Sequence, residues 1–194
     1  MNSKKIFTIP NILSAFRILL VPVIVWMYFQ ESVPNHFLIA FMLVILSGLT
    51  DICDGIIARR FNMISDVGKI LDPIADKLTQ FAVIFCIAWN YKMMIVVAAV
   101  IFAKELLMLI GALLLVKHGS ETPYARWWGK ATTVVLYATM LLFILAEFLN
   151  LAVPDWIITT AVALCVAFLV FSLLNYALVF IDGRKSNKKS DKTN

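Results

Sequence analysis

A short window of this chain concentrates its acidic residues, because five of the 12 lie between positions 51 and 76. Asp51 and Asp54 are three residues apart, and Asp72 and Asp76 are four residues apart. On a helix, both spacings place the two side chains on the same face. The stretches on either side are almost purely apolar, so the carboxylates are set in what the sequence indicates is membrane. A charged side chain there costs on the order of 2.5–3.5 kcal/mol.

Four carboxylates at close range repel one another unless something neutralises their charge. All-oxygen ligation suits hard divalent ions such as Mg²⁺ or Mn²⁺, and no His or Cys is placed to favour zinc. Two facing acid pairs on neighbouring helices can hold two such ions, an arrangement suited to phosphoryl displacement. The alternative is that the acids lie among lipid headgroups or pair with nearby Arg and Lys. We adopt that alternative for Asp66 but not for the two pairs.

Four residues beside the acids suit a flat ligand that carries phosphate. Gly55 and Ala58 leave the helix surface without bulk, so a flat group can approach the backbone. Arg59 offers a fork of N–H donors for phosphate oxygens. Gly68 lets the connecting loop pass close to a ligand. The window therefore predicts a metal-dependent site that handles phosphate.

Apolar runs recur along all 194 residues, and 15% of the residues are charged, against about 25% in an average soluble domain. This composition predicts an all-α polytopic membrane protein with a single domain over 1–181 and a basic, disordered tail over 182–194. An amphipathic segment at 2–9 is expected to lie on the membrane surface. Six transmembrane helices are expected, at about 10–29, 36–58, 69–89, 93–116, 130–148 and 155–181.

The distribution of the 17 Lys and Arg residues predicts the orientation. Six spans put both termini on one side of the membrane. With the termini in the cytoplasm, the expected outer loops carry only Lys92, in agreement with the positive-inside rule. Both acid pairs then lie near the cytoplasmic face. Because the basic residues are interpreted as a topology signal, no nucleic-acid partner is expected.

A polar stripe marks the first turns of the first expected helix. Asn11, Ser14 and Arg17 follow one another at steps of three, which places them on one face. The stripe could reach the acid site. It could equally be a structural cap and an arginine that extends to the membrane surface. Both interpretations stay open at this point.

The pattern D-x2-D-G-x2-A-R-x8-G-x3-D-x3-D, which runs from Asp51 to Asp76, resembles the signature of the CDP-alcohol phosphotransferases at every fixed position. The resemblance extends to the six spans and to an N-terminal helix that begins TIPNILSAFRILLVP. It covers the whole chain apart from the tail. It implies transfer of a substituted phosphate from a CDP-linked donor to an alcohol, with release of CMP.

The resemblance also implies roles for individual residues. The four acids of the pairs would coordinate two Mg²⁺ or Mn²⁺ ions, and Asp76 would also be the general base on the acceptor hydroxyl. Gly55, Ala58, Arg59 and Gly68 would line the CDP site. Members of the family are commonly homodimers, and the resemblance implies a bacterial plasma membrane as the location.

The acceptor alcohol is indicated by two stretches, TIPNILSAFR and GKILDPIADKL, which are most similar to the phosphatidylglycerophosphate synthases. These join CDP-diacylglycerol to glycerol 3-phosphate. An anionic acceptor needs cations near the metals, and Lys104 and Lys130 are the candidates for binding it. Lys104 could instead pair with Glu105 or a motif acid. Lys130 could be an ordinary positive-inside residue at the start of a helix.

Three departures keep other acceptors open. Members that use glycerol 3-phosphate commonly have Arg at the position of Lys104, a second Arg at the position of Ala112, and GKxKT where this chain reads GKATT. Fewer cations weaken the case for a phosphorylated acceptor. Phosphatidylglycerol, the acceptor of the related cardiolipin synthases, is therefore the alternative, followed by inositol phosphate, serine or another alcohol.

A cation transporter is a remote alternative from a different functional class. Such transporters tend to carry acids on several separated spans, often on broken helices. Here the four acids lie at the ends of two adjacent expected spans, beside Gly and Arg residues suited to phosphate. The pattern therefore favours an enzyme.

Overall fold

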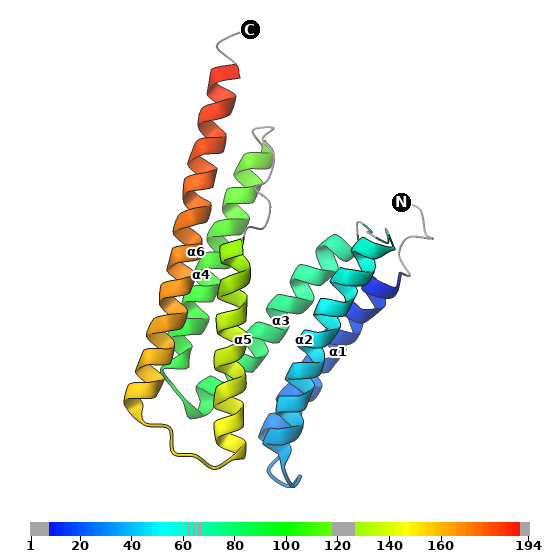
Figure 1. The fold of residues 1–194 in the computed structure, drawn as a ribbon, viewed down its shortest axis with the longest axis vertical. Helices are drawn as coiled ribbons and strands as arrows, with labels where there is room; N and C mark the ends of the chain where they lie inside the picture. Colours follow the sequence, from blue (N-terminus) through cyan, green and yellow to red (C-terminus); the bar gives the residue numbers. More distant parts are fainter. Residues whose placement is uncertain (1–7, 62, 64, 66, 118–126, 191–194) are drawn as a thin grey trace. The chain divides into compact units, whose positions relative to one another are not determined.

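The structure, a computed structural model, describes residues 8–61, 63, 65, 67–117 and 127–190. Within these residues the chain is helical and contains no strand (Figure 1). The helices are α1 (Ile9–Phe29), α2 (His36–Arg60), α3 (Gly68–Asn90), α4 (Met94–Lys117), α5 (Trp127–Phe148) and α6 (Asp155–Ser190). The all-α class that the sequence predicts is confirmed. The surface segment predicted before α1 lies almost entirely outside the described residues.

Five of these helices are long and apolar enough to cross a membrane. They contain the candidate spans Ile9–Phe29, His36–Ala58, Met94–Gly111, Trp128–Phe148 and Asp155–Leu178. Helix α3 is the exception, because Asp72, Asp76 and Lys77 interrupt its first turns. Large apolar side chains such as Leu19 and Leu142 remain exposed, as helices that face lipid require. The polytopic membrane class is confirmed, and the sixth span stays a prediction.

The chain divides into two compact units. The first comprises Met1–Lys92 and Met140–Val153, and the second comprises Met93–Thr139 and Pro154–Asn194. The prediction of a single domain stays a prediction.

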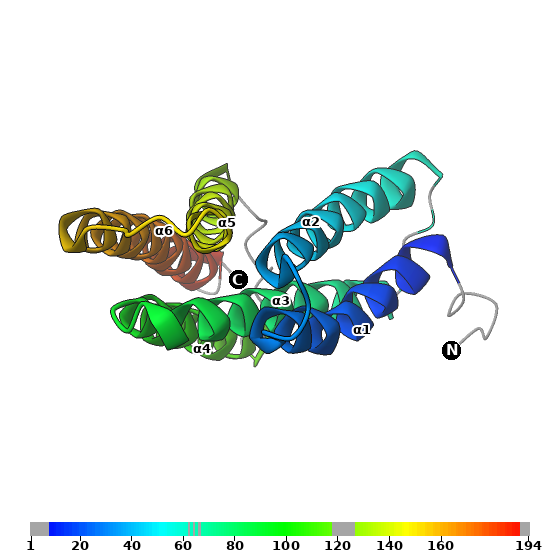
Figure 2. The same ribbon diagram turned by 90° about the horizontal axis from the view of Figure 1, so that it is seen from below.

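The first unit is built on α1, which packs against both α2 and α3 (Figure 1, Figure 2). Its core contains fully buried apolar side chains from each of these helices, including Ile24, Val44 and Ile84. Pro10 lies at the first turn of α1, where the missing N–H breaks no helical hydrogen bond. This packing fixes which face of α1 is turned toward α2 and α3.

A buried polar cluster ties the last turns of α5 to the same unit. The hydroxyl of Tyr28 donates a hydrogen bond to Glu147 Oε1 at 2.7 Å. Asn90 Nδ2 donates to the same oxygen, also at 2.7 Å. Glu147 is not among the functional residues predicted from the sequence, although a carboxyl group inside an apolar helix is a signal that could have identified it.

The second unit contains α4 packed against α6, with α5 contributing its N-terminal half. Val97, Ile101 and Leu169 are buried in it. Helix α6 continues to Ser190, beyond residue 181 where the last span was expected to end. Extending a helix that already exists costs little, and the disorder expected over 182–194 stays a prediction. Residues 191–194 lie outside the described part.

Candidate metal and substrate site

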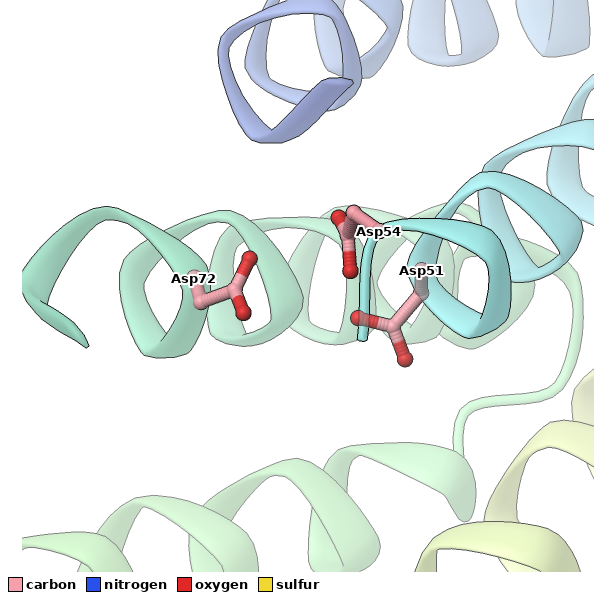
Figure 3. Close-up of side chains that lie close together, drawn as sticks. All are labelled: Asp51, Asp54 and Asp72. Atoms are coloured by element: carbon pink, nitrogen blue, oxygen red, sulfur yellow. The ribbon is translucent and has the colours of Figure 1, made fainter. Parts of the chain in front are cut away.

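Three acids of the signature meet where α2 ends and α3 begins. Asp51 and Asp54 come from α2, and Asp72 comes from the first turns of α3 (Figure 3). Each offers a carboxylate oxygen, and these oxygens all lie within 4.8 Å of one another. The side chains of Asp51 and Asp72 are 46% and 44% exposed, whereas that of Asp54 is 1% exposed. The cluster is therefore buried at one side and open at the other.

The fourth signature acid, Asp76, is not in this close group among the described residues. It lies on α3 one turn after Asp72, and its Oδ2 accepts a hydrogen bond from Gln80 Nε2 at 3.2 Å. Each residue adds about 1.5 Å along a helix, so a step of four separates two side chains by about 6 Å. The acids on α2 are three residues apart and can both lie close to Asp72.

Arg17 on α1 is buried within the acid cluster, with a side chain 1% exposed. Its guanidinium forms an ion pair with Asp51 Oδ1. It also lies 3.0 Å from Asp54 Oδ2 and 2.8 Å from Asp72 Oδ1. The open question about the polar stripe is thus answered for Arg17, which reaches the acids and does not extend to the membrane surface.

The other two residues of the stripe face the same region. Ser14 Oγ lies 2.6 Å from Asp72 Oδ1 and 3.0 Å from the carbonyl oxygen of Pro10, and its single hydrogen can be donated to one of them at a time. Asn11 Oδ1 accepts a hydrogen bond from Ser65 Oγ at 2.9 Å. Helix α1 therefore supports both the acids and the loop that precedes α3.

Gly68, the first residue of α3, is tightly enclosed by this loop. Its N–H donates to Ser65 Oγ at 2.9 Å. A Cβ atom at this position would lie 2.5 Å from Asn11 Oδ1 and 3.0 Å from Ser65 Oγ. The close approach that the sequence predicts at Gly68 is made to the protein's own side chains, and its place in a CDP site stays a prediction.

The remaining residues of the expected CDP site lie on the last turns of α2. A Cβ atom at Gly55 would meet no described atom within 4 Å, so the helix surface is open there, as expected. Ala58 is half-buried. Arg59 belongs to the helix, but its side chain lies outside the described part of the structure.

The net charge of the cluster and an unpaired carboxylate oxygen within it fit a divalent cation. Three carboxylates face one guanidinium, so a formal excess of two negative charges remains. Asp54 Oδ1 is buried and has no hydrogen-bond partner within the described chain. A buried carboxylate oxygen in that state is costly unless it binds a cation or a donor. Mg²⁺ and Mn²⁺ prefer such oxygen ligands.

The two candidates for acceptor binding lie in the second unit. Lys104 is buried in α4, and its Nζ lies 3.1 Å from Glu105 Oε1. That contact is the pairing with Glu105 that the sequence left open. Lys130 is exposed near the start of α5. The roles of both residues toward an acceptor stay predictions.

Comparison with known proteins gives matches along most of the chain. The family model described as CDP-alcohol phosphatidyltransferase matches residues 7–169, which include the whole acid site. A cardiolipin synthase (CMP-forming) of Streptomyces coelicolor is 34% identical over 74% of this chain and 68% of its own length. A CDP-diacylglycerol–glycerol-3-phosphate 3-phosphatidyltransferase of Aquifex aeolicus is 30% identical over 69% of this chain and 73% of its own length. A Rickettsia bellii protein of the same name is 36% identical over 51% of this chain and 54% of its own length.

Proposed function

The chain belongs to the CDP-alcohol phosphatidyltransferase family, and from that premise we propose that it transfers a phosphatidyl group from CDP-diacylglycerol to glycerol 3-phosphate. The products are phosphatidylglycerophosphate and CMP, so the reaction serves phospholipid biosynthesis. The relatives from Aquifex aeolicus and Rickettsia bellii bear the name of this activity, which supports the acceptor. The observation that carries the proposal is the convergence of Asp51, Asp54 and Asp72 from two helices.

In the proposed reaction, the acceptor hydroxyl oxygen forms a bond to the phosphorus that bears the diacylglycerol. The bond from that phosphorus to the bridging oxygen of CMP breaks, and CMP leaves with the electron pair. Asp51, Asp54 and Asp72, together with Asp76, would hold Mg²⁺ or Mn²⁺, two ions in the full arrangement. Bound there, the ions would neutralise the diphosphate of the donor and the charge that develops on CMP.

The proton of the acceptor hydroxyl needs a base within about 3 Å. Asp76 is proposed for this role because it lies one turn beyond the close acid group, on the same helix as Asp72. The hydrogen bond from Gln80 Nε2 to Asp76 Oδ2 restricts the orientation of its carboxylate.

The donor is proposed to lie along the end of α2. The open surface at Gly55 lets a flat nucleotide approach the helix backbone. Ala58 adds little bulk one turn later, and Arg59 would contact phosphate oxygens. Gly68 would close the site from the start of α3, and Lys104 and Lys130 would bind the phosphate of the acceptor.

The chain is further proposed to be a homodimer in a bacterial plasma membrane, with both termini and the acid site on the cytoplasmic side. The support for the orientation is the scarcity of basic residues in the expected outer loops, which carry only Lys92.

Phosphatidylglycerol is the second candidate acceptor, and two observations favour it. The Streptomyces coelicolor relative is named a cardiolipin synthase and shares 34% identity with this chain. The chain also has Ala112 and the sequence GKATT where members that use glycerol 3-phosphate commonly carry further cations. In that reaction the same donor and the same acids would produce cardiolipin and CMP.

The deciding experiment measures CMP release by the purified full-length protein with CDP-diacylglycerol and Mg²⁺. Glycerol 3-phosphate and phosphatidylglycerol are supplied as separate acceptors. We expect release with glycerol 3-phosphate, lost in Asp76→Asn and retained in the control Asp155→Asn, which changes an exposed acid in the first turn of α6. Release with phosphatidylglycerol alone would establish the second candidate. Failure to bind CDP-diacylglycerol would contradict both.

A further inference from the structure

Arg17 lies outside the signature that defines the metal and CDP residues, yet it makes more ion pairs with the acid cluster than any other described residue. We propose that Arg17 is a positioning residue that holds one oxygen of each of Asp51, Asp54 and Asp72, and so leaves the second oxygen of each carboxylate for a divalent cation. This inference rests on the proposed function, because it assigns how that site binds its metal.

The contacts are divided among the carboxylates in the way this role requires. Nη1 of Arg17 contacts Asp51 Oδ1, while Nη2 contacts Asp54 Oδ2 and Asp72 Oδ1. Only one oxygen of each carboxylate is used in these contacts. Asp54 Oδ1, the second oxygen of the most deeply buried acid, is buried and has no hydrogen-bond partner in the described chain. The guanidinium therefore orients the three carboxylates without occupying the oxygens that would bind the cation.

Ser14 adds to the same orientation. Its Oγ lies 2.6 Å from Asp72 Oδ1, the oxygen that Arg17 also contacts at 2.8 Å. Two donors from successive turns of α1 thus converge on one oxygen of Asp72. Donors of this kind, placed behind metal ligands, set the direction of the ligands and are commonly worth about 10–100-fold in metal affinity.

An alternative role for Arg17 is a placeholder cation that leaves when a metal ion arrives. Its burial argues against that role, because a guanidinium 1% exposed would have to be withdrawn from three partners into a packed helix interface. Separating a buried ion pair is costly, because it leaves a buried charge uncompensated. With Arg17 in place, the three carboxylates retain a formal excess of two negative charges, which a divalent ion would balance.

The two roles predict opposite effects of Arg17→Lys, which keeps the charge but replaces a planar fork by a single ammonium group. A positioning role requires weaker metal binding, since lysine cannot hold three carboxylates in the same geometry. A placeholder role requires equal or tighter metal binding, since the competing cation is less well held. Mn²⁺ binding to the purified full-length protein, measured by electron paramagnetic resonance without substrates, distinguishes them.

We expect Arg17→Lys to weaken Mn²⁺ binding by about 10–100-fold. The control is Arg60→Lys, an exposed arginine at the last residue of α2, which should bind Mn²⁺ as the unmodified protein does. Unchanged or tighter binding in Arg17→Lys would overturn the proposal. If the unmodified protein itself binds no Mn²⁺, the proposed metal-dependent function fails, which is a separate result.

A second variant keeps the test decisive if Arg17→Lys does not fold. Ser14→Ala removes one donor to Asp72 and leaves Arg17 in place. We expect it to weaken Mn²⁺ binding in the same direction and to raise the Mg²⁺ concentration needed for half-maximal CMP release more than it lowers the maximal rate. Unaltered Mn²⁺ binding in a folded Ser14→Ala protein would count against a role of α1 in positioning the ligands.

Discussion

Replacing Gly68 by alanine tests the packing that joins α1 to the start of α3. The added Cβ would lie 2.5 Å from Asn11 Oδ1 and 3.0 Å from Ser65 Oγ, closer than such atoms normally approach. Overpacking of this kind costs about 1–3 kcal/mol. Because Gly68 has no left-handed φ, alanine meets no backbone strain, and its higher helix propensity would otherwise stabilise the protein by up to about 1 kcal/mol. The sign of the change in the free energy of unfolding therefore shows whether Asn11 and Ser65 enclose Gly68.

The measurement is the free energy of unfolding in detergent micelles for Gly68→Ala, Asn11→Ala and the double variant. Asn11→Ala removes the side chain that the new Cβ would meet, so the cost of Gly68→Ala should be smaller in that background. We expect a coupling energy of about 0.5–3 kcal/mol between the two positions.

A neutral or stabilising Gly68→Ala would refute this reasoning, because it would mean that Asn11 does not enclose the glycine. Additive effects in the double variant would refute it as well. Gly48→Ala on α2 is a matched control, since a Cβ there would meet no described atom within 4 Å.

Three further predictions concern other parts of the chain. Glu147→Ala should destabilise the fold by about 1–3 kcal/mol, measured by unfolding in micelles, because Tyr28 and Asn90 would lose their shared buried acceptor; an unchanged stability would contradict that contact. Gly55→Leu should not lower the stability, because a Cβ there meets no described atom within 4 Å and leucine favours a helix over glycine by about 0.5–1 kcal/mol, but it should raise the KM for CDP-diacylglycerol, and an unaltered KM would remove Gly55 from the donor site. Removing divalent ions with a chelator should abolish CMP release, and Mg²⁺ or Mn²⁺ should restore it; release that persists without them would exclude metal dependence.

The sequence predicted the helical membrane class and the meeting of acids at the α2–α3 junction. Both depend on local rules, since apolar runs define helices and spacings of three or four define faces. The same rules placed Asp76 with the other three acids, because they give the face but not the distance along the axis. Among the residues that the structure describes, the close group contains Asp51, Asp54 and Asp72 but not Asp76.

The place of Arg17 could not be settled from spacing alone. A stripe at steps of three shows that Asn11, Ser14 and Arg17 share a face, but the rotation of α1 about its axis depends on packing against α2 and α3. The same limit applies to Glu147, whose partners come from α1 and α3. The placement of Arg17 and the partners of Glu147 both depend on contacts between segments that are far apart in the sequence.

The C-terminal end of α6 could not be predicted from the sequence, for a different reason. A polar, basic composition indicates that a segment cannot bury a core, but it does not stop a helix that apolar residues have already begun. Helix α6 accordingly continues to Ser190. The resemblance to the family, by contrast, is confirmed by the match over residues 7–169.

The measurement that tests the proposed site most directly compares acceptor-dependent CMP release by the unmodified protein and by Asp54→Asn, with CDP-diacylglycerol and Mg²⁺. Asparagine keeps the shape of Asp54 and an oxygen for Arg17 but removes the charge of the most deeply buried ligand. We expect release that requires an added acceptor in the unmodified protein and background release in the folded variant. Equal release by both proteins would contradict a metal site built on Asp51, Asp54 and Asp72.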